Sequence, residues 1–406
     1  EDVKQNAQIR LAMISVQQQK REQAVQTYLT LYNSAEDPID KLGFLRNLTQ
    51  ISAAGKDWER LDKFAHMMLD SEEAEGKQVE AQEFYYKEEA YFNLALAAEE
   101  QNDYFKARDY LISGFEKFPK SFFSSDMLIK LGIYYLTIDE IRNEPNSIDI
   151  AADYFSRFVK LFPNTSYTEM ANYYLGFCYY NGRRFDDAYN AFKSFTTKYP
   201  NSEFTPEAVF YYSDCQYNLG NMEDCINGFN VVISKYMGHE KAEEAYYTKA
   251  WALMDIARDE EAIETLSTLV EKYPQSQFAP SSIFSIADYL YNEQKYDEAV
   301  EMYQKVLDNF PDSEVAIKVP ETLTELKETI AYLEYEKAFN LYDQARTSED
   351  LNLYRQAAEM FMDVAQNNPY TEAEIGSYSN GGMCYEAIEE WQNAVDCYDI
   401  DRKSVV

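Results

Sequence analysis

The sequence has little glycine and proline, with 13 and 11 copies in 406 residues. Sheet-rich and dinucleotide-binding folds need more glycine than this for their turns, so the scarcity argues against both classes. No apolar run approaches the roughly 20 residues of a membrane-spanning helix, and the first residues show no signal-peptide pattern. With 2 His, and 5 Cys that form no CxxC pair, we expect neither a metal site nor a cofactor.

Basic residues are also scarce, since 37 Lys and Arg face 71 Asp and Glu, which gives a formal net charge of −34. Phosphate recognition needs Lys and Arg, so this balance excludes nucleic acid and anionic membrane surfaces as partners. It favours a basic or neutral protein or peptide. The acids are spread along the chain, and a second interpretation, solubility or adaptation to a salty habitat, therefore stays open.

Apolar and aromatic residues are abundant. Apolar residues make up 46% of the chain, which excludes a disordered protein. A single compact helical core does not extend to 406 residues, whereas an array of repeats does, because each unit packs only on its neighbours. The 36 Tyr and 24 Phe exceed what a thin repeat core is expected to use.

An aromatic-Pro-x-Ser/Thr element recurs along the middle of the chain. Its prolines, together with Met237 in a degenerate copy, stand 37 residues apart and predict units at 164–200, 201–237, 238–274 and 275–311. The copies are Phe118-Pro119-Lys120-Ser121, Phe162-Pro163-Asn164-Thr165, Tyr199-Pro200-Asn201-Ser202, Tyr236-Met237-Gly238-His239, Tyr273-Pro274-Gln275-Ser276 and Phe310-Pro311-Asp312-Ser313.

Each unit contains two stretches with the apolar spacing of an amphipathic helix. Ser202 and Ser276 are candidates to cap the first helix, and Pro206 and Pro280 fall in its first turn. The second helix opens with acids that suit the positive end of its dipole. Small residues recur where the two helices meet, and large residues follow four positions later. These pairs are Ala188 and Phe192, Cys225 and Phe229, Ala262 and Leu266, and Ala299 and Tyr303.

This small-then-large pattern resembles the tetratricopeptide repeat, whose short form has 34 residues. The resemblance implies an all-α, right-handed superhelical solenoid of about nine helix pairs that binds proteins and is not an enzyme. We expect degenerate repeat-like helices in 1–82, a regular array in 83–311 and further units in 312–400, the last of them truncated. Residues 401–406 resemble a non-native tail.

The aromatic-Pro-x-Ser ending and the 37-residue period are similar to a bacterial subset of the family. That subset includes the outer-membrane barrel-assembly lipoprotein and the periplasmic coordinator associated with the Tol-Pal system. The resemblance implies a role in cell-envelope assembly, in the periplasm or on the periplasmic face of the outer membrane. A cytoplasmic location is the alternative.

In the tetratricopeptide arrangement the first helices line the concave face. Counted from the residue after each closing Pro, or after Met237, positions 10, 14, 17 and 18 share one face of that helix. They predict an aromatic strip, edged by amides, that is centred on residues 170–292 and binds an extended peptide. The interpretation that these rings are core stays open, above all at position 10. The candidate residues are Tyr173, Phe177, Tyr180, Asn181, Phe210, Tyr217, Asn218, Tyr247, Trp251, Phe284, Tyr291 and Asn292.

No phosphate loop, nucleophile elbow or metal-ligand motif is present in the sequence. His66 and His239 have no evident base or nucleophile beside them, and the paired acids recur once per unit, as dipole compensation does. The favoured function is a protein-binding scaffold without catalytic residues. Two alternatives remain: a glycan-binding solenoid of the envelope, and the regulatory array of a larger enzyme or signalling protein.

Overall fold

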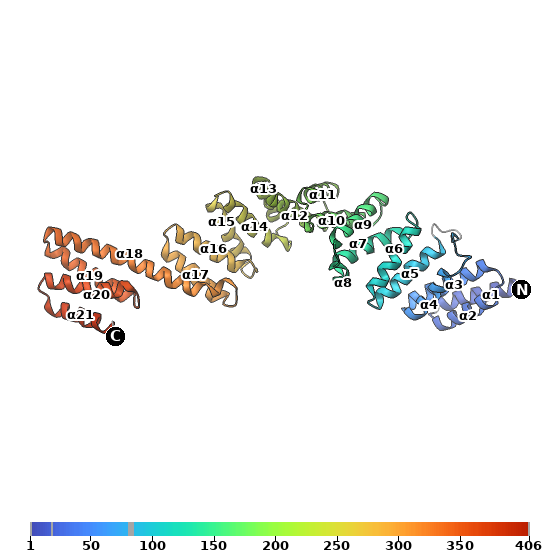
Figure 1. The fold of residues 1–406 in the computed structure, drawn as a ribbon, viewed down its shortest axis with the longest axis horizontal. Coiled ribbons are helices and arrows are strands. Elements are labelled where there is room, and N and C mark those ends of the chain that lie inside the picture. Colours follow the sequence, from blue (N-terminus) through green and yellow to red (C-terminus); the bar gives the residue numbers. More distant parts are fainter. Residues whose placement is uncertain (1, 18, 80–84, 405–406) are drawn as a thin grey trace. The chain divides into compact units, whose positions relative to one another are not determined.

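A computed structural model describes residues 2–17, 19–79 and 85–404 (Figure 1). Within these residues the regular elements are helices, and the only strand-like pairing is an isolated bridge between Gln78 and Tyr85. The chain divides into two compact units, Glu1–Lys241 and Ala242–Val406. Each unit is described by itself below.

The first unit is a succession of helices in which each packs on the next. Its helices are α1 (Asp2–Gln17), α2 (Arg21–Ser34), α3 (Pro38–Gly55), α4 (Trp58–Leu69), α5 (Tyr86–Glu100), α6 (Tyr104–Lys117), α7 (Ser124–Thr137), α8 (Asp139–Arg142), α9 (Ser147–Leu161), α10 (Thr168–Asn181), α11 (Phe185–Lys198), α12 (Thr205–Asn218) and α13 (Met222–Lys235).

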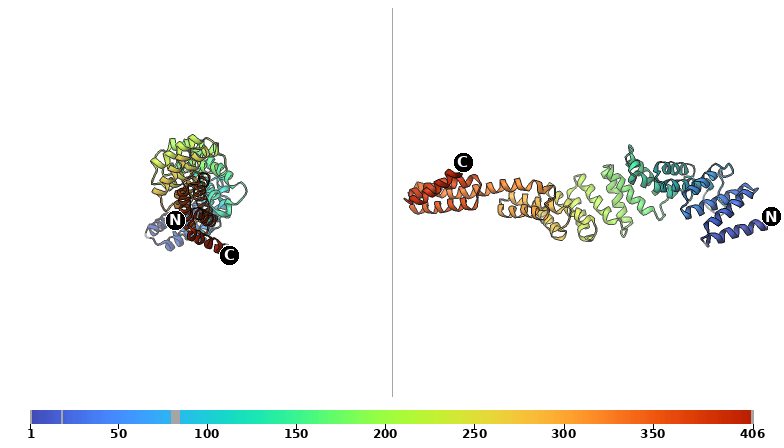
Figure 2. Two further views of the ribbon diagram at one scale, coloured as in Figure 1. Left: turned by 90° about the vertical axis from the view of Figure 1, so that its left-hand side faces the viewer. Right: turned by 90° about the horizontal axis from the view of Figure 1, so that it is seen from below.

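The second unit continues in the same style until one helix doubles in length. Helix α18 has 30 residues and runs beside α19 (Figures 1 and 2). The elements are α14 (Lys241–Asp255), α15 (Asp259–Lys272), α16 (Ala279–Asn292), α17 (Tyr296–Asn309), the 3₁₀ turn η1 (Val315–Ile317), α18 (Val319–Ser348), α19 (Leu351–Asn367), α20 (Glu372–Ala387) and α21 (Trp391–Ser404).

The predicted all-α architecture of stacked helix pairs is confirmed. Without the four-residue helix α8, the described residues form ten pairs, compared with the predicted number of about nine. Helix α8 lies between α7 and α9, the two helices of one pair. The last unit, expected to be truncated, has a second helix of 14 residues, as α11 does. The boundary at 82/83 and Val405 and Val406 of the predicted tail lie outside the described residues.

The first helices begin differently from the prediction. Ser202 and Ser276 do not occupy the capping position, because the helices start at Thr205 and Ala279 and the serine hydroxyls accept from the backbone N–H of Phe204 and Phe278 at 3.1 and 3.2 Å. Each hydroxyl therefore shapes the turn ahead of the helix. The predicted prolines do lie in the first turn of α12 and α16.

The core is built where a small residue on one helix meets a ring on the other. A Cβ atom on Gly176 would lie 2.9 Å from the ring of Phe192, which is fully buried. The same relation holds for Gly132 and Phe155 at 2.7 Å. Because real Cβ atoms do not approach this closely, glycine sets the distance between the two helices of these pairs.

Two buried acids on α5 bond to other elements, and one of them attaches the weakly patterned N-terminal helices to the array. Glu89 is 5% exposed and accepts from Arg46 at 2.7 Å and Gln50 at 3.1 Å, which joins α5 to α3. Glu88 accepts from the backbone N–H of Phe123 at 2.6 Å, just before α7. Burial raises the pKa of Glu88, while the hydrogen bond from Phe123 acts to lower it.

Replacing Gly176 tests the close helix contact. We expect Gly176→Val to lower the free energy of unfolding by about 2 kcal/mol, because overpacking a fitted core costs about 1–3 kcal/mol. The matched control is Gly238→Val, since a Cβ atom at Gly238 meets nothing within 4 Å. Urea unfolding followed by circular dichroism measures both. Equal urea midpoints for Gly176→Val and Gly238→Val would contradict the close contact between Gly176 and Phe192.

Candidate functional site

The position-10 residues of the first unit lie inside the core. Tyr173 on α10 and Phe210 on α12 are 4% and 2% exposed. The ring of Tyr173 stacks on Phe204 with centroids 4.7 Å apart, and its hydroxyl donates to the carboxylate of Glu207. For these two residues the structure favours packing over ligand contact, the interpretation that the sequence had left open.

Tyr180 at position 17 links two successive first helices. Its hydroxyl donates to Oδ2 of Asp214 on α12 at 2.6 Å, and the amide of Asn218 donates to the same oxygen at 3.0 Å. Burial, followed by the bond to Asp214, raises the pKa of the Tyr180 phenol well above its ordinary value. The half-buried ring of Tyr180 lies 4.8 Å from that of Tyr211.

The other predicted residues of the first unit line the same helix face. Phe177 and Tyr217 are half-buried, and the ring of Tyr211 covers Phe177 at 5.5 Å. Asn181 and Asn218 are exposed, but their amides donate to backbone oxygens four residues earlier at 3.1 and 2.9 Å. The recurring Asn therefore has a local role at the helix end that spacing alone did not indicate.

The second unit leaves more of its rings in solvent. Trp251 on α14 is 41% exposed and Tyr291 on α16 is 40% exposed. Tyr247 is half-buried, stacked on Phe278 at 5.0 Å and edge-on to Trp251 at 6.0 Å. The half-buried ring of Phe284 packs on Tyr303 at 5.4 Å, and Asn292 is exposed beside Tyr291.

The repeat register offers a reason for the exposure of Trp251. Phe177 and Trp251 both stand at position 14 of their repeats. At position 11 of the next repeat, Tyr211 follows Phe177, and Ser285 follows Trp251. A tyrosine covers its neighbour, whereas a serine side chain is too short to do so. The exposed indole is thus encoded by a small residue 34 positions away.

Carboxylates accompany the rings of the second unit. Asp288 at position 14 of α16 accepts from the hydroxyl of Tyr303, and burial raises the pKa of this carboxyl. Asp255, which takes the place of Asn at position 18 of α14, is exposed. An exposed indole and acidic groups on the same row of helices can together receive a cationic side chain.

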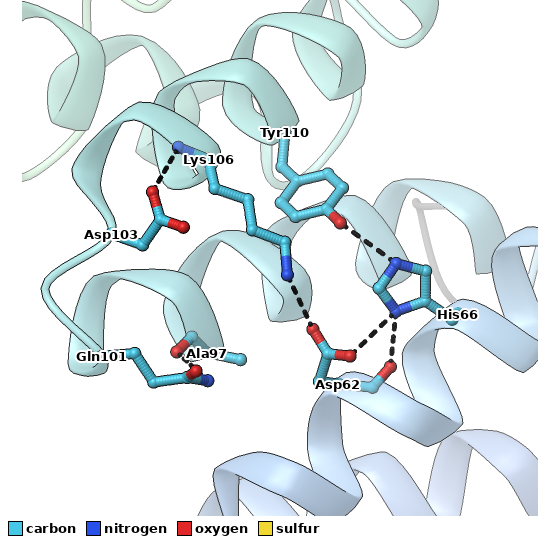
Figure 3. Close-up of polar contacts among 7 residues, drawn as sticks. All are labelled: Asp62, His66, Ala97, Gln101, Asp103, Lys106 and Tyr110. Atoms are coloured by element: carbon cyan, nitrogen blue, oxygen red, sulfur yellow. Dashed lines mark hydrogen bonds and ion pairs between the residues drawn. The ribbon is translucent and has the colours of Figure 1, made fainter.

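His66 has partners that the sequence did not reveal (Figure 3). Its Nδ1 lies 2.8 Å from the backbone oxygen and 3.2 Å from the carboxylate of Asp62, and its Nε2 lies 3.0 Å from the Tyr110 hydroxyl. Both groups at Nδ1 are acceptors, so this nitrogen carries the hydrogen. From the sequence, His66 had no evident base or nucleophile beside it; in the structure its ring contacts Asp62, four residues earlier, and Tyr110, 44 residues later.

The His66 network connects α4 with α6. Lys106 extends it by contacting Asp62 at 3.4 Å, and the backbone N–H of Lys106 is capped by Asp103 at 3.1 Å (Figure 3). The residues bonded to the imidazole are a tyrosine and an aspartate, and neither is a serine or cysteine nucleophile. We interpret the network as a link between neighbouring repeats within the first unit.

Across residues 2–17, 19–79 and 85–404, no group of three or more His, Cys, Asp or Glu side chains could hold a metal ion. In the same part of the chain, every helix is too short or too polar to cross a membrane.

Comparisons with known families match repeat segments of this chain. A family model described as "Outer membrane lipoprotein" matches residues 170–292, and one described as "Tetratricopeptide repeat" matches 89–121 and 282–313. None of the curated protein sequences matches significantly.

Solved structures are similar in fold at low identity. The crystal structure of MamA protein is 18% identical, covers 46% of this chain and 92% of its own, and has a TM-score of 0.39. PilW, a widely conserved type IV pilus biogenesis factor, is 15% identical over 60% of this chain and 98% of its own, with a TM-score of 0.37. Naa15/Naa10 bound to HypK-THB is 11% identical and has a TM-score of 0.50, with 98% of this chain and 58% of that chain covered.

The buried tyrosines predict sensitivity to alkali. Burial raises the pKa of Tyr173 and Tyr180, so the folded state favours the neutral phenol. Their contribution to stability is complete below the ordinary phenol pKa of about 10 and is lost as the pH rises above it. We expect helix content to fall above about pH 10 in step with phenolate absorbance.

Tyr180→Phe removes both the hydrogen bond to Asp214 and one of the phenols that ionise at high pH. It should lower the free energy of unfolding by about 1 kcal/mol at pH 7 and make stability less dependent on pH above about 10. Tyr291→Phe, at an exposed ring, is the control and should change neither. Full retention of helix content in the parent protein at a pH where all its phenols have ionised would refute the expectation.

Proposed function

Because the chain belongs to the tetratricopeptide repeat family, we propose that it is a non-catalytic scaffold that binds an extended peptide or partner protein along its first helices. The observation that carries the proposal is the exposure of Trp251 and Tyr291, at 41% and 40%, on the successive first helices α14 and α16. Large rings presented side by side from a rigid layer of helices are typical anchors for a partner.

The proposed anchors have supports that hold them in place. Tyr247 packs edge-on against Trp251, and Tyr296 packs edge-on against Tyr291 at 5.7 Å. Ordered rings lose little conformational entropy when they bind, and they offer a large contact area. Asn292 adds an exposed amide that can pair with a ligand backbone.

Charge supports a basic or neutral partner. The formal net charge is −34, and Asp255 and Asp288 stand at positions 18 and 14 of the strip in the second unit. Such a surface attracts cationic segments and repels nucleic acid and other polyanions. Association with a basic partner should accordingly weaken as salt increases.

The proposed setting is assembly in the bacterial cell envelope, in the periplasm or at the outer membrane. Support comes from the outer membrane lipoprotein family model, which matches residues 170–292, the segment on which the predicted strip is centred. The absence of an enzyme activity is part of the same proposal. In its support, the imidazole of His66 is committed to Asp62 and Tyr110 on neighbouring helices.

Substitution of the exposed rings tests the scaffold function. The full chain, immobilised, is incubated with a bacterial envelope extract beside Trp251→Ala/Tyr291→Ala. We expect the double variant to lose the captured protein, and its affinity for that purified protein to fall about 30-fold, as a loss of about 2 kcal/mol implies.

The matched control is Trp391→Ala, because Trp391 is 61% exposed on α21, outside the strip. Both proteins should keep the parent's unfolding midpoint. Capture that is equal in the parent and the double variant would refute the strip as a binding surface. Recovery of polysaccharide that persists at high salt would instead favour the glycan-binding alternative.

A further inference from the structure

Helix α18 departs from the rule of paired helices of about 14 residues. Its 30 residues bury different sides in its two halves: Val319, Leu323 and Leu326 in the first, then Ala331, Ala338 and Ala345 in the second. The neighbours differ accordingly, since α18 contacts η1 and α17 as well as α19 and α20. Two packed sides leave a third side of the helix in solvent (Figure 1).

That third side carries a defined row of residues, here named the α18 stripe: Glu321, Glu325, Tyr332, Glu336 and Phe339. Their spacings of three, four and seven residues place them within one narrow face of a helix. Tyr332 is 60% exposed and Phe339 is 41% exposed, and the three glutamates are exposed. The α18 stripe is thus a row of aromatic rings set among acids.

Basic residues of α18 lie away from the α18 stripe. By helical spacing, Lys327 and Lys337 face other sides of the helix. Arg346, beyond the end of the α18 stripe, is paired with Asp343 at 2.7 Å. Between Glu321 and Phe339, all the charged residues of the α18 stripe are therefore negative.

A neighbouring turn packs against the same helix. The backbone N–H of Glu372 donates to Glu328 of α18 at 3.2 Å, and Asn368 donates to Glu334 at 2.7 Å. These bonds hold the turn between α19 and α20 against α18. Tyr370 in that turn is 96% exposed and has a φ of +68°, a conformation that aromatic residues rarely adopt.

We propose that the α18 stripe is a docking surface for a basic amphipathic helix of a partner protein. The rings of Tyr332 and Phe339 give apolar contact and receive cationic side chains on their faces. Glutamates at four- and eleven-residue spacing match Lys or Arg at the same spacing on a second helix. This surface is separate from the strip at 173–292, so either can fail without the other.

The test uses the full chain and a labelled 18-residue synthetic peptide in which Leu and Lys share one helical face. A scrambled peptide of equal composition has no such face. Affinity is measured by fluorescence anisotropy at physiological salt. We expect Tyr332→Ala/Phe339→Ala, which keeps the net charge, to bind the amphipathic peptide at least about tenfold more weakly, as one lost aromatic anchor implies.

The control Phe105→Ala/Phe122→Ala removes two rings that are 43% and 58% exposed in the first unit, and it should bind as the parent does. Glu325→Gln/Glu336→Gln should also weaken binding and reduce its salt dependence. Equal affinity of parent and ring variant, or of ordered and scrambled peptide, would mean diffuse charge attraction and overturn the proposal. So would a ring variant that only loses self-association, because the occupant would then be a second copy of the chain.

Discussion

The contact between a small residue on one helix and a ring on the other is the constraint on which this architecture depends. Where Gly176 meets Phe192, the space for a single Cβ atom is missing, so the separation of α10 and α11 is set by the absence of a side chain. Each unit must repeat this fit, because a repeat array has no common core that could compensate for a misplaced pair. The recurrence of a small residue followed four positions later by a large one in each repeat is the consequence.

Aromatic residues serve two purposes here, and their neighbours determine which one. Phe177 and Trp251 occupy equivalent positions, yet Tyr211 covers the first, whereas the repeat position that corresponds to Tyr211 holds Ser285 for the second. Tyr173 and Tyr180 on α10 donate to acids of α12, the first helix of the next repeat, and so join one repeat to the next. Rings that lack such a cover or acceptor are the ones left for a partner.

The repeats could be predicted from the sequence because each unit restates the same local rules. Proline in the first turn, acids at the start of the second helix and small residues at the crossing point all recur at fixed spacing. Features that depend on pairs of units were not accessible in this way. The burial of Tyr173 follows from Phe204 and Glu207, and the partner of His66 lies 44 residues away. Helix α18 escaped prediction because it breaks the period.

Departures from the period are informative about binding for a physical reason. In a regular unit nearly every apolar side chain has a counterpart, since the next unit presents the complementary face. Helix α18 replaces the usual alternation by one long rod whose two halves pack on different sides, which leaves Tyr332 and Phe339 without the cover that a regular unit would supply. Exposed rings cost solubility, and the glutamates between them offset that cost while selecting for a partner of opposite charge. The irregular helix and the smaller residue at Ser285 thus lead by different routes to the same result, an aromatic surface beside acids.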